Sequence, residues 1–123
     1  MTQATFEITK AATFDAAHFL PLGPEGGRYR RMHGHSFRVE ATVRGEAEPE
    51  AGWVLDLAEL DEALGEIARG LDHGVLNEQP GLETPTLEQI CLYFAGRLKP
   101  RFPGLSRIVV ARPSVGESCA IGL

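Results

Sequence analysis

The chain has 123 residues, a length typical of one domain, and we expect a single domain over residues 1–123. Hydrophobic residues make up 43% of it and charged residues 24%, as in ordinary globular proteins. The formal net charge of −5 argues against a nucleic-acid partner, because such proteins present a basic face. No apolar run is long enough for a transmembrane helix, so we expect no membrane partner.

The N-terminal residues 1–5 carry no basic segment followed by an apolar run, so they do not look like a signal peptide. Cys91 and Cys119 form no C-x-x-C motif, which favours two reduced thiols. Both features lead us to expect a cytoplasmic protein.

Two segments with alternating polarity predict long strands near the start of the chain, over residues 6–18 and 33–44. The first segment has Phe14, Ala16 and His18 on one face. The second segment has His33, His35, Phe37 and Val39 on one face. Residues 21–31 contain two prolines and three glycines, which predicts a loop between the strands. An antiparallel hairpin of these strands brings all three histidines to one end of one face.

Apolar residues at spacings of three and four predict a helix over residues 57–71 and a second helix that starts at Thr86 and stops before Pro100. Asp56 and Thr86 are predicted N-caps, whose side chains accept a hydrogen bond from the amide three residues further on. Residues 72–85 are predicted to form a loop.

The C-terminal part predicts a strand over residues 106–112, a turn over 113–117 and a short strand over 118–123. The order is therefore ββααββ. We expect an α+β fold in which two helices cover one face of a four-stranded antiparallel sheet.

The histidines indicate a metal site. Side chains two apart on a strand share a face at a separation of roughly 7 Å, so His33 and His35 can converge on one ion. His18, at the end of the earlier strand, can supply a third ligand. Three neutral imidazoles leave a tetrahedral Zn²⁺ with one open position, as in catalytic zinc sites.

Several motifs connect this pattern to a known family. They are Phe14-Asp15-Ala16-Ala17-His18, His33-Gly34-His35-Ser36-Phe37, the segment 52–60, Leu71-Asp72-His73, Leu76-Asn77 and Thr84-Pro85-Thr86. With them the chain resembles, over essentially its whole length, the 6-pyruvoyl-tetrahydropterin and 6-carboxytetrahydropterin synthases, which are T-fold proteins. The resemblance implies a zinc-dependent lyase acting on a small-molecule substrate of the dihydroneopterin triphosphate type.

The same resemblance implies particular roles and an assembly. It implies Zn²⁺ bound by His18, His33 and His35, and a proton-relay pair formed by Asp72 and His73. An alternative for His73 is simply to cap the preceding helix, where the helix dipole favours a cation. The family implies a homo-oligomer, a trimer or a hexamer of stacked trimers, in which the sheets close into a barrel with sites at subunit junctions. Unpaired edge strands also favour such assembly.

Two positions depart from the family pattern. Tyr29 stands where the family has a catalytic cysteine, either as a replacement proton carrier or as an aromatic cover of the pocket. Arg112 stands where a glutamate grips the pterin ring. A guanidinium has only donors and suits a carboxylate or a phosphate. Glu117, just beyond, is the other candidate for the substrate-binding role.

These departures leave two alternatives to the pterin lyase. The first is a diverged enzyme acting on an anionic heterocycle that is not a pterin. The second is a non-catalytic zinc protein that binds a ligand or serves in assembly.

Overall fold

The computed structural model describes residues 4–123, so the first three residues of the segment considered for a signal peptide lie outside it. Its four strands form one antiparallel sheet in the order β1-β2-β3-β4. In chain order the elements are β1 (Thr5–His18), β2 (His33–Glu46), α1 (Leu57–Leu71), α2 (Leu87–Leu98), β3 (Leu105–Arg112) and β4 (Glu117–Gly122). The predicted α+β fold with ββααββ order is confirmed.

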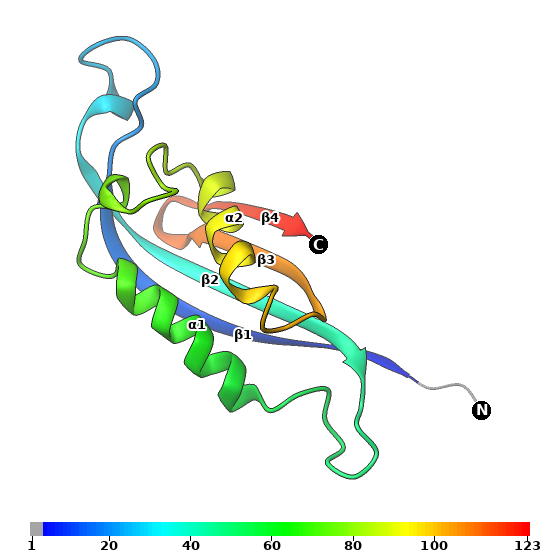
Figure 1. Ribbon diagram of the computed structural model, residues 1–123. Coiled ribbons are helices and arrows are strands. Elements are labelled where there is room, and N and C mark those ends of the chain that lie inside the picture. The colour runs from blue at the N-terminus through cyan, green and yellow to red at the C-terminus, as the bar shows by residue number, and fades with distance from the viewer. Residues whose placement is uncertain (1–3) are drawn as a thin grey trace.

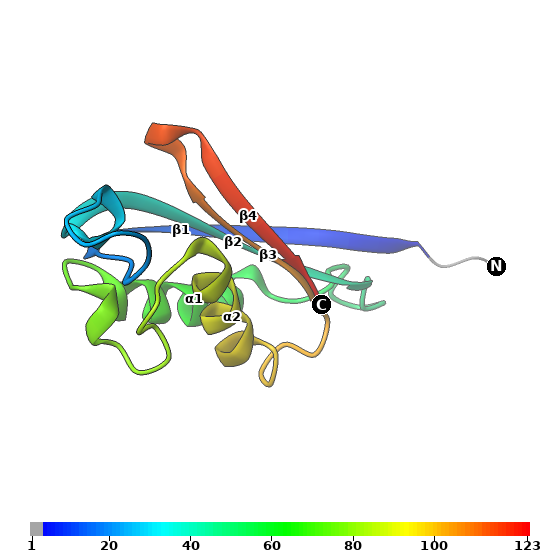
Figure 2. The same cartoon turned by 90° about the horizontal axis from the view of Figure 1, so that it is seen from above.

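Both helices lie against the same face of the sheet, and the opposite face carries no helix (Figures 1 and 2). The core lies between the two layers, where Phe14, Phe37, Leu64 and Phe94 are at most 2% exposed. Phe14 stacks on Phe37 with ring centroids 5.0 Å apart. Burial of these side chains fixes which face of each strand points to the helices, because a one-residue slip would turn the apolar set to the outside.

The β1–β2 ladder runs without interruption from the Thr5–Glu46 pair to the His18–His33 pair. Ala16 pairs with His35, and Phe14 with Phe37. The alternation predicted for both strands therefore holds, and the histidines extend the core face to the end of the ladder next to the connecting loop.

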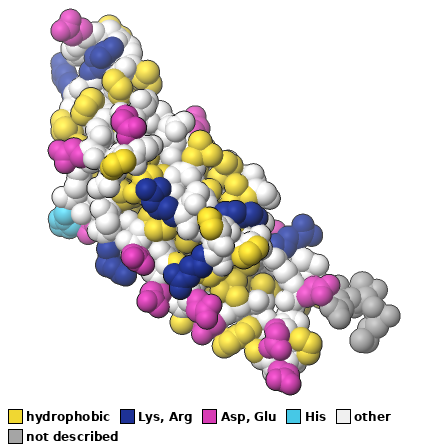
Figure 3. Space-filling view, viewed as in Figure 1, with side chains coloured by type: hydrophobic (Ala, Val, Ile, Leu, Met, Phe, Trp, Pro, Cys, Tyr) yellow, Lys and Arg dark blue, Asp and Glu magenta, His cyan; other side chains and the backbone are white. Residues whose placement is uncertain are grey.

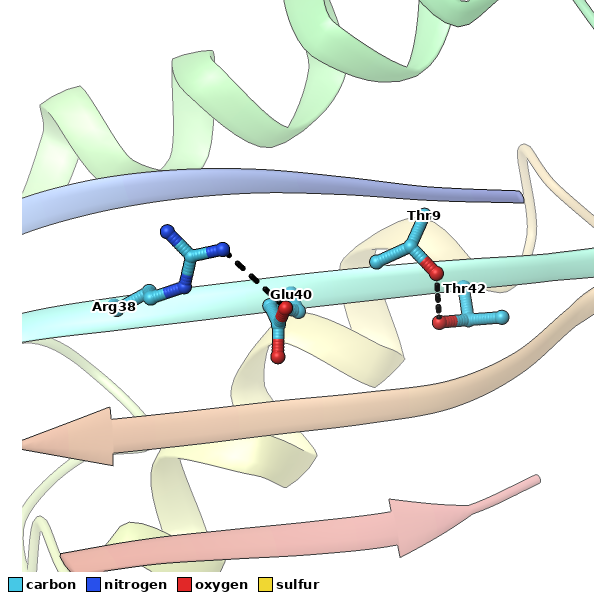
Figure 4. A network of polar contacts seen from close by, with 4 residues as sticks. All are labelled: Thr9, Arg38, Glu40 and Thr42. Atoms are coloured by element: carbon cyan, nitrogen blue, oxygen red, sulfur yellow. Dashed lines mark hydrogen bonds and ion pairs between the residues drawn. The ribbon is translucent and has the colours of Figure 1, made fainter. Parts of the chain in front are cut away.

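The helix-free face of this ladder is polar. The hydroxyls of Thr9 and Thr42 are joined by a hydrogen bond of 2.7 Å (Figure 4). On β2, the guanidinium of Arg38 lies 3.4 Å from a carboxylate oxygen of Glu40. Opposite polarity on the two faces gives the alternation from which the strands were predicted.

The two N-cap residues are those predicted from the sequence, but one of their hydrogen bonds differs from the prediction. The Thr86 hydroxyl accepts from the Gln89 amide at 3.2 Å, as predicted. The Asp56 carboxylate accepts instead from Ala58, two residues on, at 2.9 Å, so the predicted bond from Glu59 is wrong. The Glu59 amide donates to the Asp56 carbonyl at 3.0 Å, which leaves the Ala58 amide as the free donor for the side chain.

The β3–β4 hairpin is tighter than the sequence suggested. Pro113–Val115 form a single 3₁₀ turn, and Gly116 follows with φ +68° in the left-handed region that glycine adopts at little cost. The predicted turn over 113–117 therefore ends one residue early. Glu117 begins β4 and pairs directly with Arg112.

The helix side of the surface has an uneven charge distribution (Figure 3). Acidic side chains gather along α1, including Glu59, Asp61, Glu62 and Glu66, whereas Arg97 lies on α2 with Lys99 and Arg101 just beyond it. Within residues 4–123, no helix combines the length and apolar character needed to cross a membrane.

Candidate metal centre and ligand cavity

The three histidines meet at the end of the β1–β2 ladder. Their candidate ligand atoms all lie within 4.8 Å of one another, and His18 is fully buried. His18 Nε2 lies 3.0 Å from His33 Nε2. The convergence predicted from the strand pattern is therefore present.

Backbone carbonyls orient two of the rings. The carbonyl of Pro85 lies 3.1 Å from His18 Nδ1, and that of Arg31 lies 2.7 Å from His33 Nδ1. Because a carbonyl can only accept, each Nδ1 carries the proton, and a neutral ring then has its lone pair on Nε2. The two Nε2 lone pairs point at one another, an arrangement that repels unless a cation or a proton lies between them.

His35 completes the site. Its Nε2 is buried and, among the described residues, has no hydrogen-bond partner. A buried nitrogen without a partner costs free energy, and a metal ion supplies the missing partner. Nitrogens bound to one tetrahedral zinc lie about 3.3 Å apart, from Zn–N bonds of about 2.0–2.1 Å, which is close to the 3.0 Å found here. The residues present therefore fit a zinc ion.

Electrostatics favour the neutral form of His18 and of His35. Desolvation by burial is the main cause that lowers the pKa of His18 to about 4, against 6.5 for an ordinary histidine. Desolvation also lowers the pKa of His35, and the nearby positive charge of Arg112 adds to that effect. Neutral imidazole is the form that binds metal.

A cavity of about 670 Å³ opens beside the cluster. It is lined by His33 and His35 on β2, by the loop before β2, and by the β3–β4 hairpin. Tyr29 lies in its wall on a short 3₁₀ turn and is 55% exposed. Arg28, Arg31 and Arg112 also line it. The structure thus places Tyr29 beside the histidines, as its position before the His33-Gly34-His35 motif suggested.

Arg112 and Glu117 line this same cavity together. The Nε of Arg112 lies 3.0 Å from a carboxylate oxygen of Glu117, and the two side chains are 16% and 52% exposed. The contact is an ion pair without a well-aligned hydrogen bond, because the buried Nε has no acceptor in line with its N–H. The sequence left open which residue lies near the metal ligands, and cross-strand pairing puts both there.

Asp72 and His73 follow the last residue of α1. His73 lines a second cavity of about 580 Å³ together with Asp15, Ser36 and His35, and His35 also lines the first cavity. His73 Nε2 is 3.5 Å from a carboxylate oxygen of Asp72, and its side chain is 83% exposed. Within one chain the predicted dyad is therefore formed, but it does not line the cavity that holds Tyr29 and Arg112.

The strand before His18 anchors this dyad. The amide of Asp15 donates to the Asp72 carboxylate at 2.8 Å, and the amide of His73 donates to the Asp15 carbonyl at 2.7 Å. These bonds hold His73 at φ +60°, an uncommon conformation for a residue with a side chain. They show that the exposed imidazole is fixed at its base.

Sequence reasoning missed two polar residues of the second cavity, Asp15 and Ser36. The Ser36 hydroxyl donates to the Asp15 carboxylate at 2.5 Å, and the two residues are paired in the β1–β2 ladder. The ladder register was the signal that could have found them, since the hairpin that aligns His18 with His33 also aligns this pair.

Comparisons with known proteins agree with the family resemblance of the sequence motifs. The sequence model of the 6-pyruvoyl tetrahydropterin synthase family matches residues 7–121. A 6-carboxy-5,6,7,8-tetrahydropterin synthase from Synechocystis is 38% identical over 109 residues, covering 84% of this chain and 83% of the relative. A dihydroneopterin monophosphate aldolase from Pyrococcus furiosus is 33% identical over 97 residues, covering 79% and 78%.

A solved structure is similar in fold. The 6-pyruvoyl tetrahydropterin synthase of Caenorhabditis elegans superposes with a TM-score of 0.86 at 22% sequence identity, covering 100% of this chain and 99% of that one. Together with the matched sheet and helices, this likeness assigns the T-fold topology.

Proposed function

The chain belongs to the 6-pyruvoyl tetrahydropterin synthase family, and from that premise we propose that it is a zinc-dependent lyase acting on a dihydroneopterin triphosphate-type substrate. Relatives named as a 6-carboxytetrahydropterin synthase and as a dihydroneopterin monophosphate aldolase support a pterin as the ring that is handled. The carrying observation is the histidine cluster, with facing Nε2 atoms 3.0 Å apart and a third Nε2 buried without a partner.

The cluster assigns the metal ligands of the proposed enzyme. His18, His33 and His35 hold the zinc ion, which when bound supplies positive charge that polarises a side-chain oxygen of the substrate. The Pro85 and Arg31 carbonyls keep two of the rings turned toward the ion. The open cavity of about 670 Å³ beside the cluster gives the substrate access.

Proton transfer is assigned to His73, oriented by Asp72. The carboxylate lies 3.5 Å from the imidazole and orients it, so that His73 can take a proton from the substrate and return it. Tyr29 is the proposed second proton carrier, from the wall of the histidine cavity. At neutral pH a smaller fraction of a phenol than of a thiol is ionised, because their ordinary pKa values are about 10 and about 8.5, so Tyr29 fits better as a donor to the substrate than as the group that starts the reaction.

We propose that the His73 used at each site comes from a second copy of the chain. His73 lies outside the histidine cavity of its own chain and is 83% exposed, so it is available to a neighbour. β1 and β4 are the edge strands of the sheet, and pairing between copies would satisfy their free backbone groups. We therefore place each site at a subunit junction of a trimer or hexamer.

The test is turnover by purified, zinc-loaded protein given dihydroneopterin triphosphate. Substrate should be consumed, and His73→Ala should slow consumption by about a hundredfold or more, the contribution of a general acid or base. Glu62→Gln, on an exposed part of α1, is the matched control and should act like the original protein. Bound zinc without any turnover would reject this substrate.

A second candidate, chemistry on an anionic heterocycle that is not a pterin, is favoured by Arg112 in the cavity wall. Thermal-shift screening separates the two, because stabilisation by anionic ligands other than pterins supports the second candidate. The non-catalytic alternative predicts instead that His73→Ala leaves the protein's biological role intact.

A further inference from the structure

We propose that Arg112, held by Glu117, is the anchor for an oxyanion of the ligand, a carboxylate or a phosphate, in the cavity beside the three histidines. The proposal deepens the function proposed above and rests on the same cavity being the ligand site. It names the chemical group that the cavity wall recognises.

The placement of Arg112 is the first argument. Its side chain follows Ile108 and Val110 on the core face of β3, and it is only 16% exposed. A guanidinium presents five N–H donors in a planar fork. Glu117 lies 3.0 Å from Nε and leaves that N–H poorly aligned, so the fork has donors for an incoming acceptor. Two parallel bonds from such a fork match a carboxylate or phosphate.

Charge around the cavity is the second argument. Arg28, Arg31 and Arg112 line it, and among residues 4–123 Glu117 is the only acidic residue in that lining. Figure 3 shows Lys or Arg side chains, beside acidic ones, at the end of the molecule formed by the loop between β1 and β2. A metal ion at the histidines adds further positive charge. An excess of cations in a concave site favours an anionic ligand.

The position of Glu117 is the third argument. Its carboxylate faces the Arg112 guanidinium across the β3–β4 pair, which makes it a partner for the arginine. Glu117 thus has two opposite effects. It holds the arginine side chain in place, and it partly neutralises the charge that an anion would meet.

The experiment measures binding by calorimetry to the zinc-loaded protein, without turnover. The probes are tripolyphosphate as a phosphate source, pterin-6-carboxylate as a carboxylate source, and unsubstituted pterin as the uncharged reference. Arg112→Gln should weaken binding of at least one anionic probe by about tenfold or more, the effect of losing a charge-assisted pair of bonds. The probe that responds identifies the source of the oxyanion.

Arg107→Gln is the matched control, because it removes the same charge from an exposed position of the same strand. It should leave all affinities within about twofold, as surface charges outside a site do. Arg112→Lys keeps the charge without the fork and should fall between Arg112→Gln and the original protein. Equal effects of Arg112→Gln and Arg107→Gln would overturn the proposal.

Glu117→Gln separates the two effects of that carboxylate. Tighter binding of the responsive anionic probe shows that loss of the opposing charge dominates, weaker binding shows that loss of the hold on Arg112 dominates, and Glu62→Gln on α1 should give neither shift. Unchanged binding in Glu117→Gln would contradict the assigned role of that carboxylate. Because no step of the measurement requires catalysis, an inactive protein that still shows these shifts rejects the lyase and keeps the oxyanion anchor.

Discussion

His18 and His33 form the last pair of the β1–β2 ladder, and their Nε2 atoms lie 3.0 Å apart. Each ring is held from behind by a backbone carbonyl, that of Pro85 for His18 and that of Arg31 for His33. The strand register and two loop carbonyls together aim both lone pairs at one point. This preorganisation means that little side-chain entropy remains to be lost when a metal ion binds.

Replacing one imidazole should remove the metal. We expect His33→Ala to reduce bound zinc from about one ion per chain toward none, because two remaining ligands leave the tetrahedral site half open. His73→Ala removes an exposed imidazole outside the cluster and should keep the full zinc content. Elemental analysis after gel filtration measures both. Equal zinc in the two variants would place the metal elsewhere.

Mixing two inactive variants should restore activity if the site is shared between copies. We expect His33→Ala and His73→Ala each to be inactive alone. Co-refolded oligomers should recover part of the turnover, because some junctions then combine an intact metal cluster with an intact His73. The control mixes His33→Ala with His35→Ala, whose defects fall in the same cluster and cannot complement. No recovery in the first mixture would mean that each chain carries a complete site.

Metal-free protein should lose stability in mild acid. The folded-state pKa of His18 is about 4 and the unfolded value is 6.5, so the unfolded chain binds the extra proton between these pH values. The free energy of unfolding is therefore highest above pH 6.5 as far as His18 is concerned, and it decreases as pH falls toward 4. Between pH 7 and pH 5 the loss should be about 2 kcal/mol, from 1.36 kcal/mol per pKa unit.

Urea unfolding of the chelated protein at both pH values measures this loss. His18→Gln should flatten the dependence of unfolding free energy on pH, and His73→Ala should retain it. The same slope in His18→Gln as in the original protein would assign the acid sensitivity to other groups.

The two helix caps should separate fold stability from the metal site. Loss of either capping side chain, in Asp56→Ala or Thr86→Ala, should cost about 1 kcal/mol of unfolding free energy. Only Thr86 follows Pro85, whose carbonyl orients His18, so Thr86→Ala should also weaken zinc binding, by up to about tenfold. Chemical denaturation and competition with a zinc chelator give the two values. Equal zinc affinity in both variants would show that the cap does not support the site.

Much of the candidate site could be predicted because it depends on local pattern. Alternation in residues 6–18 and 33–44 put three histidines on the apolar face, and an antiparallel hairpin brought them together. The N-caps Asp56 and Thr86 could be predicted for the same reason, since a cap is a contact between near neighbours. The bond of Asp56 was misassigned because cap geometry depends on which amide the backbone already uses.

The chemistry of the cavity wall was harder to predict. Glu117 was assigned to a turn, and its place beside Arg112 depends on the left-handed Gly116 and the hairpin register. The Asp15–Ser36 contact depends likewise on register. A carboxylate or a hydroxyl side chain does not by itself predict a place in a site, because both are frequent on any exposed strand face.

The amino-acid order alone determined the α+β class, the helix-covered face of each long strand and the set of three imidazoles. It could do so because side-chain periodicity and capping act over a few residues. Tertiary structure alone decided that Arg112 and Glu117 share a cavity with His33 and His35, and that His73 lines a different cavity together with His35. The physical reason is that both outcomes depend on how separate segments are brought together by core burial and strand register, which no short stretch of sequence encodes by itself.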